Sequence, residues 1–147
     1  IAYDNLFSSW IAKGIDFSFI PNDTNTDLHP NTVDIRMENE DGRVMSVRGE
    51  STGGGKVRIV RINQVQVDFT GEYNAVIIIQ QDKPGVAAHI TKCLGDNNVN
   101  IAFMRIFRES KGETAYTIVE SDGKLPDDIA SRLRDNPHIH DVMLIQN

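Results

Sequence analysis

The second half of the chain alternates β-prone and helical stretches in an order that few folds accommodate. The run Tyr73–Gln80 is strongly β-prone, and "DKPG" then opens a helical stretch that continues to about Asp96. In that stretch Val86, Ile90 and Leu94 are spaced four apart, so they share one face of a helix. A strand, its hairpin partner, a short helix and a closing strand are expected to follow, at Ile101–Phe107, Thr114–Glu120, Pro126–Arg134 and Ile139–Ile145.

This order of strand, helix, two strands, helix and strand predicts a ferredoxin-like βαββαβ arrangement. In such an arrangement both helices pack on one face of an antiparallel sheet and the other face is left free. The pattern changes around Thr70–Glu72, which places a domain boundary there. We therefore expect an α+β protein, with a small α/β domain over residues 1–71 followed by the ferredoxin-like domain over residues 72–147.

The first domain is predicted to begin with a helix and to continue in strands. Aromatic residues three to four apart, flanked by Leu6 and Ile11 and followed by Gly14 as a stop, indicate the helix: Tyr3, Phe7 and Trp10. "PNDTNTDLHPN" is dense in turn formers and must be a loop. Strands are expected over Ile15–Phe19, Val33–Met37, Val44–Arg48, Lys56–Ile62 and Gln64–Phe69. Because the chain starts with Ile1 in what reads as mid-helix, we expect this domain to be truncated.

Composition excludes several classes of partner. The net charge of −6 and a pI near 5.1 argue against nucleic acid, whose binders usually carry a basic stripe. The longest apolar run, Ala75–Ile79, is too short to span a bilayer, and no secretory leader is visible. The single cysteine, Cys93, excludes a disulfide framework within the chain and suits a reducing cytoplasm. We expect a cytoplasmic protein with no membrane partner.

The stretch "ESTGGGKVRI" looks at first like a phosphate-binding loop, but it fails that pattern at both ends. A P-loop has glycine five residues before its Gly-Lys and a hydroxyl residue after it, whereas this chain has Glu50 and Val57 there. The stretch also leads into a strand, while phosphate loops lead into a helix. Two interpretations stay open: a turn or bulge that needs positive φ, or a bare backbone that contacts a ligand.

Two motifs carry a family resemblance. "HPNTV", from His29, and "STGGGKV", from Ser51, together resemble the substrate-related domain in the β chain of iron–sulfur-dependent bacterial L-serine dehydratases. The segment from "RIVRIN" to "TIVES" resembles that family's regulatory ACT domain and the strands before it. The resemblance covers essentially the whole chain. The family's Ser-Ser-Ser-His-Thr motif, expected upstream of the opening helix, is missing here, which agrees with a truncated first domain.

The resemblance implies an enzyme that eliminates water from L-serine to give pyruvate and ammonia. It implies a [4Fe–4S] cluster that a partner α chain holds, because one cysteine cannot bind such a cluster. It assigns no catalytic residue to this chain. It does imply a set of residues on the substrate side: His29, Asn31, Thr32, Ser51, Gly53, Gly54 and Gly55.

A second site is predicted where "QQDKPGV" meets "NVNIA". Pro84 suits the first turn of a helix, and Gly85 leaves the unpaired amides at the positive helix end open to a ligand carboxylate. Asp82 can accept from an ammonium group, and both polar ends together suit a free amino acid. The resemblance to ACT domains places the effector at Gln80, Asp82, Gly85, Val86, Asn100 and Ile101, commonly between two domains packed side by side. The first candidate for the effector is L-serine, and the alternative is another amino acid. The resemblance also implies a homodimer that forms through the ACT domain.

Plainer interpretations of these residues remain open. Asp82 could simply cap the helix and Asn100 could make a turn. The layout also resembles the C-terminal regulatory region of some D-3-phosphoglycerate dehydrogenases, which share "RIVRIN…VD" and "DKPGV". A third alternative is an assembly module that dimerises without a ligand.

Other polar residues are given structural roles. Cys93 is expected as a half-buried thiol beside the apolar helix face, and His89 as partly packed. His138 and His140 lie two apart on a strand, but no cysteine or carboxylate cluster accompanies them, so no metal site is predicted. His29 either contacts the substrate or the cluster region of the partner chain, or it caps a turn.

Overall fold

The structure is a computed structural model that describes residues 8–21 and 27–146. The chain divides into two compact units, residues 1–30 and residues 31–147. Both four-stranded sheets belong to the second unit. The predicted boundary between residues 71 and 72 falls in the connection between those sheets and stays a prediction.

The first unit contains a helical turn over residues 8–12. It stops at Gly14, which has a φ of 73° and whose N–H donates to the Ile11 carbonyl at 2.9 Å. Glycine adopts this left-handed conformation without steric cost, so the predicted stop is confirmed. The residues that predicted the start of this helix lie outside the described part of the chain: Tyr3, Leu6 and Phe7.

The strand predicted over Ile15–Phe19 is wrong, because residues 15–20 join no sheet. The aromatic rings of this segment pack locally instead. Trp10 meets Phe17 edge to face with centroids 5.6 Å apart, and Phe17 meets Phe19 at 5.8 Å. Its alternating apolar residues therefore serve a chain of aromatic contacts and not one face of a sheet.

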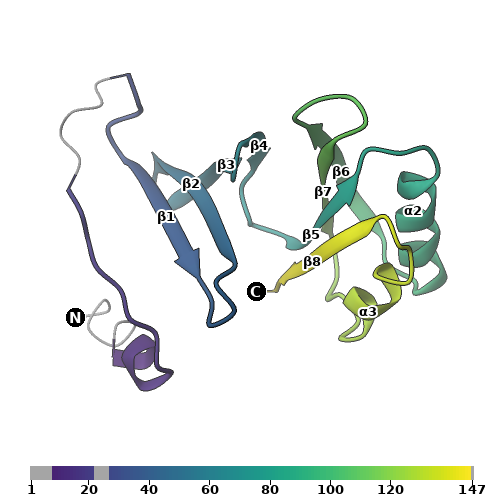
Figure 1. Ribbon diagram of the computed structural model, residues 1–147, viewed down its shortest axis with the longest axis horizontal. Coiled ribbons are helices and arrows are strands. Elements are labelled where there is room, and N and C mark those ends of the chain that lie inside the picture. Colours follow the sequence, from purple (N-terminus) through teal and green to yellow (C-terminus); the bar gives the residue numbers. More distant parts are fainter. Residues whose placement is uncertain (1–7, 22–26, 147) are drawn as a thin grey trace. The chain divides into compact units, whose positions relative to one another are not determined.

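The first sheet is an antiparallel meander in which neighbours in sequence are neighbours in space (Figure 1). The four strands confirm those predicted after residue 31, with β2 running several residues further: β1 Thr32–Glu38, β2 Val44–Gly53, β3 Lys56–Ile62 and β4 Val65–Phe69. Tight turns join them. At the β2–β3 turn, Gly53, Gly54 and Gly55 have φ values of 89°, 62° and 79°, which confirms the predicted positive-φ turn.

The second sheet has the order β6-β7-β5-β8 with antiparallel neighbours. Its elements confirm the predicted βαββαβ order: β5 Asn74–Gln81, α2 Val86–Asp96, β6 Ile101–Arg108, β7 Thr114–Ser121, α3 Ile129–Leu133 and β8 Ile139–Ile145. The second helix is shorter than predicted, since the segment after Pro126 makes a turn before α3 begins. The α+β class is confirmed, and the fold of residues 74–145 is ferredoxin-like.

Both helices lie on one face of this sheet (Figure 1), and a core fills the space between them. From α2 the core takes Val86, Ile90 and Leu94, all at most 1% exposed, as their spacing predicts. Ile78 of β5 and Leu133 of α3 complete its centre. Burying one such side chain stabilises the fold by roughly 1.5–3 kcal/mol, so this layer holds α2 in place against β5.

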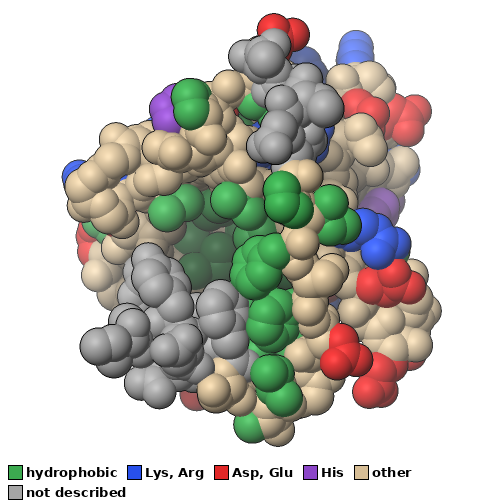
Figure 2. Space-filling model, turned by 90° about the vertical axis from the view of Figure 1, so that its left-hand side faces the viewer, with side chains coloured by type: hydrophobic (Ala, Val, Ile, Leu, Met, Phe, Trp, Pro, Cys, Tyr) green, Lys and Arg blue, Asp and Glu red, His purple; other side chains and the backbone are tan. Residues whose placement is uncertain are grey.

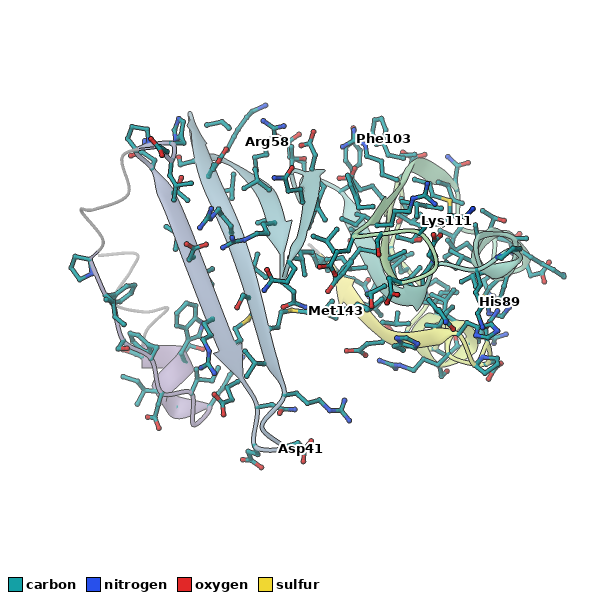
Figure 3. All side chains as sticks on the ribbon, turned by 45° about the horizontal axis from the view of Figure 1, so that its top comes forward. Asp41, Arg58, His89, Phe103, Lys111 and Met143 are labelled. Atoms are coloured by element: carbon teal, nitrogen blue, oxygen red, sulfur yellow. The ribbon has the colours of Figure 1, made fainter. Side chains whose placement is uncertain are left out.

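The opposite face of the second sheet is not free, so that part of the prediction is wrong. Ile77 of β5 and Tyr116 and Ile118 of β7 form a second core with the first sheet. The first sheet contributes Ile62, Val65, Val67 and Phe69 to it, all at most 5% exposed. Met143 of β8 also lies between the two sheets (Figure 3). The reason is visible in the unbroken apolar run of β5, which has apolar side chains for both of its faces.

The far strand of the first sheet is covered less. Val33, Ile35 and Met37 alternate along β1 and share one face, yet each stays exposed. Figure 2 shows hydrophobic side chains gathered on the face of the molecule that it presents. The buried part of the first sheet is therefore its β3–β4 side.

Candidate functional site

Residues 82–86, the helix corner, connect β5 to the start of α2. Gly85 is the N-cap of α2, with φ 88° and ψ −19°, and no side chain caps the first turn. A Cβ on Gly85 would meet no atom within 4 Å, so the backbone is open on this side. The helix starts at Val86, so Pro84 lies just before it and not in its first turn as predicted. The first amides of α2 thus have no side-chain acceptor from the described chain.

Asp82 supplies the negative charge at this corner. Its Oδ2 accepts the Gly112 N–H at 3.0 Å and lies 3.1 Å from Nη1 of Arg108. The Gly112 hydrogen bond and then the Arg108 guanidinium hold the pKa of the Asp82 carboxyl below its usual value of 3.8. Asp82 is thus ionised at neutral pH and does not cap the helix, which excludes the plainer interpretation of this residue. Lys111, labelled in Figure 3, belongs to the same β6–β7 loop as Gly112.

The side chains of Gln80 and Val86 are buried below the exposed backbone of the corner. Gln80 is 3% exposed, and its Oε1 accepts a hydrogen bond from Thr117 Oγ1 at 3.1 Å. Val86 is 1% exposed and belongs to the helix-side core. These two residues therefore set the shape of the corner from below, while Asp82 and the α2 amides present its polar groups.

Asn100 and Ile101 lie at the other end of the sheet. Gln81 pairs with Thr114 at one end of β7, and Ile101 pairs with Ser121 at the other. The seven-residue interval from 114 to 121 corresponds to about 23 Å of strand. Asn100 donates to the carboxylate of Asp122 there. One copy of the chain does not bring Asn100 to Asp82.

The predicted substrate-side residues gather at one end of the first sheet, with one exception. The Ser51 N–H donates to the Asn31 carbonyl at 3.0 Å, and Thr32 pairs with Glu50. The glycine turn follows directly, and a Cβ on any of its glycines would meet open space. The two sequence motifs are thus neighbours through the β1–β2 register. His29 is exposed and falls in the first unit.

Sequence reasoning missed the partners of these residues. Arg108 and Gly112 lie 26 and 30 positions from Asp82, and Thr117 lies 37 positions from Gln80. The link depends on hairpin register, which single residues do not reveal. The one signal for these contacts in the sequence was the glycine of the predicted Lys111–Gly112 turn, because turn amides point outward and can donate to a nearby acceptor.

The helix side of the domain carries a groove of about 260 Å³ between α2 and α3. His89 Nε2 lies 3.1 Å from the Leu133 carbonyl, and Lys92 pairs with Asp96 at 2.6 Å. Cys93 is half-buried there, and burial raises the pKa of its thiol. The polar groups of the groove are thus largely used by one another.

Two negative findings apply to the described residues. Within ranges 8–21 and 27–146, no three His, Cys, Asp or Glu side chains gather in a way that could hold a metal ion. In the same ranges, no helix has the length and apolar character needed to cross a membrane.

Comparison with known proteins gives a consistent picture. Residues 75–138 match the family model for the ACT domain. The chain is 32% identical to a probable L-serine dehydratase β chain of Bacillus subtilis over 91% of its own length and 60% of that protein's. It is 27% identical to the L-serine dehydratase β chain of Peptoniphilus asaccharolyticus, over 82% of its length and 54% of that protein's.

A different kind of enzyme is also similar to this chain. A D-3-phosphoglycerate dehydrogenase of B. subtilis is 40% identical over 60% of this chain, which is 17% of that protein. Another, from Methanocaldococcus jannaschii, is 27% identical over 92% of this chain, which is 25% of that protein. The chain spans a larger share of the dehydratase β chains, between half and two thirds of their length. The predicted resemblance is thus confirmed: the chain contains an ACT domain and is a relative of the L-serine dehydratase β chains.

Proposed function

We propose that this chain is part of the β chain of an L-serine dehydratase, which eliminates water from L-serine to give pyruvate and ammonia. The observation that carries the proposal is the 32% identity over 91% of this chain together with the 60% of the Bacillus subtilis β chain that this similarity covers. The D-3-phosphoglycerate dehydrogenases share the same region with this chain, but the chain covers only 17% and 25% of the two named above.

In this proposal the turn end of the first sheet helps shape the substrate side. Asn31, Thr32 and Ser51 lie there beside the bare glycine turn, so small polar residues and open backbone lie together at this end of the sheet. Backbone without side chains lets a ligand approach closely. The sequence and structure assign no catalytic acid or base to this chain.

A [4Fe–4S] cluster does not fit the residues present. Such clusters take several thiolate ligands, and Cys93 is the chain's only cysteine, half-buried on α2. We therefore place the cluster, as a Lewis acid, in a partner α chain. The complete site would then need both chains.

The ACT domain is proposed to bind a free amino acid, with L-serine the first candidate. The ligand carboxylate would meet the uncapped amides of α2, and Asp82 would attract the ammonium group. Asn100 would come from a second copy. In the described sheet β6 is an edge strand, and antiparallel pairing of two such edges would bring the start of one β6 to the end of the other.

Activity tests the enzyme proposal. A full-length β chain mixed anaerobically with its α chain should form pyruvate from L-serine, and neither chain alone should do so. If the complete anaerobic mixture forms no pyruvate, the dehydratase proposal fails.

A second candidate is the regulatory end of a D-3-phosphoglycerate dehydrogenase, favoured by the 40% identity over 88 residues. Its discriminating feature is a nucleotide-binding domain encoded upstream in the same reading frame. Calorimetry separates both candidates from a ligand-free assembly module. If no amino acid binds at millimolar concentration, the helix corner is not an amino-acid site.

A further inference from the structure

Two polar contacts link the two sheets, one part-buried beside the apolar core and one exposed. Asn63 Nδ2 donates to the Tyr116 hydroxyl at 2.8 Å, and Arg105 donates to the Asp68 carbonyl. The first contact is part-buried and lies beside Ile62 and Val65, both at most 5% exposed. A hydrogen bond in such surroundings is directional where apolar packing is not, so it fixes the position of one strand against another.

Asn63 is held in place from the other side as well. Its N–H donates to the Ser46 carbonyl at 2.7 Å, and its Oδ1 accepts the Ser46 N–H at 2.9 Å. The residue has a φ of 51°, a left-handed conformation that asparagine tolerates better than most residues. Asn63 thus connects β2 of the first sheet directly to β7 of the ACT domain.

Tyr116 lies close to the helix corner along β7. The next residue, Thr117, donates to Gln80 beneath the corner, and Gly112 at the preceding turn donates to Asp82. Successive residues of a strand point to opposite faces, so β7 contacts the corner's support with one face and Asn63 with the other. A shift of this end of β7 would therefore move the contacts with Gln80 on one face of the sheet and with Asn63 on the other.

We propose that the Asn63–Tyr116 link transmits occupancy of the helix corner to β2, the strand that carries Ser51 and leads into the glycine turn. This inference rests on the proposed amino-acid site. A ligand that ties the α2 amides to Asp82 restrains the start of β7 through Gly112. The link passes that restraint to Ser46, five residues before Ser51 on the same strand. Tyr116 is in this sense a positioning residue for the first sheet.

The test uses Tyr116→Phe, which removes one hydroxyl and keeps the buried ring. Tyr73→Phe is the matched control, because Tyr73 is 39% exposed and packs by its ring on Phe103. Amide hydrogen exchange at Ser46 and Asn63 is measured on the intact protein, with and without saturating L-serine, and calorimetry measures binding in parallel. Without ligand, Tyr116→Phe should speed exchange at both amides roughly fivefold, the effect of losing one hydrogen bond, and the control should not.

With L-serine, exchange at these amides should slow in the native protein and in the control. Tyr116→Phe should bind L-serine equally well and show no slowing. Binding without slowing in the native protein, or slowing that persists in Tyr116→Phe, overturns the transmission. Absence of binding in calorimetry overturns the amino-acid site itself, and transmission with it. The two failures are thus told apart.

Discussion

Arg48 and Asp34 face each other across β2 and β1, and the guanidinium donates two hydrogen bonds to the carboxylate, at 2.8 Å from Nε and 2.7 Å from Nη2. Arg61 adds a third contact at 3.1 Å. The Arg48 hydrogen bond holds the pKa of Asp34 below its usual 3.8. This pair joins the most exposed strand of the first sheet to its neighbour on the polar face.

Replacing Asp34 by Asn should cost less than about 1 kcal/mol at pH 7, because the Asp34 side chain is 50% exposed and solvent screens its charge. Since the native pKa is depressed, the contribution is present above the unfolded-state pKa and is lost as the pH falls through the native one. Native protein and Asp34→Asn should therefore converge in stability in strong acid. Denaturant titrations at pH 7 and in acid check this, and added salt should narrow the difference at pH 7. A gap that persists undiminished in acid would contradict the electrostatic origin.

Glu120 presents the opposite case. It is 5% exposed on β7, and its Oε1 finds no hydrogen-bond partner among the described residues. Burial raises the pKa of this carboxyl; Arg105 opposes the shift, and Asp68 and Glu72 add to it. With a raised native pKa, its stabilising contribution is complete at low pH and is lost as the pH rises through that value.

Glu120→Gln should therefore raise the melting temperature at pH 7, by about 3 °C, and the gain should vanish as the pH falls below 4.5. Thermal melts at a series of pH values measure it. Glu109→Gln, the same change at an exposed position, should show no such trend. An equal gain at every pH would mean that shape and not charge is responsible.

The same substitution at two glycines of one helix should have opposite signs. Gly85 has a φ of 88°, so Gly85→Ala should destabilise the protein by about 1 kcal/mol and disturb the corner. Gly95 lies within α2 with open space around it, so Gly95→Ala should stabilise by about 0.5 kcal/mol. Denaturant midpoints decide the signs. Two effects of equal sign would contradict the assigned start of α2.

Asp82→Asn should weaken L-serine binding at least about tenfold, because the ammonium group loses its counter-charge. The amide oxygen can still accept the Gly112 N–H, so the fold should be kept. Asp127→Asn, whose side chain is 91% exposed, is the control and should bind normally. Calorimetry at constant pH measures both. Equal affinities would show that Asp82 serves only Arg108 and Gly112.

Cys93 should react slowly with thiol reagents in the native protein. Burial raises the pKa of its thiol, and the thiolate is the reactive form. Alkylation at pH 7.5 should accelerate by more than roughly tenfold when denaturant unfolds the chain. Equal rates in both states would contradict the half-buried position.

Local patterns predicted local structure well. The four-residue spacing of Val86, Ile90 and Leu94 identified both α2 and its buried face, because helical periodicity depends only on near neighbours. The strand predicted from the alternation at Ile15–Phe19 was wrong for a related reason. A pattern shows which side chains are apolar but not which part of the chain packs against them. In this segment Trp10 packs against Phe17.

Contacts between distant segments were harder to predict. The helix corner itself was predicted, but Arg108 and Gly112 reach Asp82 through the β6–β7 hairpin. The separation of Asn100 from Asp82 likewise follows from strand register. The apolar run of β5 contained the signal that both of its faces are buried, although nothing in it names the first sheet as the second cover.

The cover that the first sheet gives to the second matters to anyone who would transplant this ACT domain into a chimaera. A graft cut at residue 72 would turn Ile77, Tyr116 and Ile118 toward water. Such a graft would aggregate through this exposed apolar face, or the face would pack against an apolar surface of the host protein. The graft therefore has to include β3 and β4, or those three residues have to be replaced by polar ones.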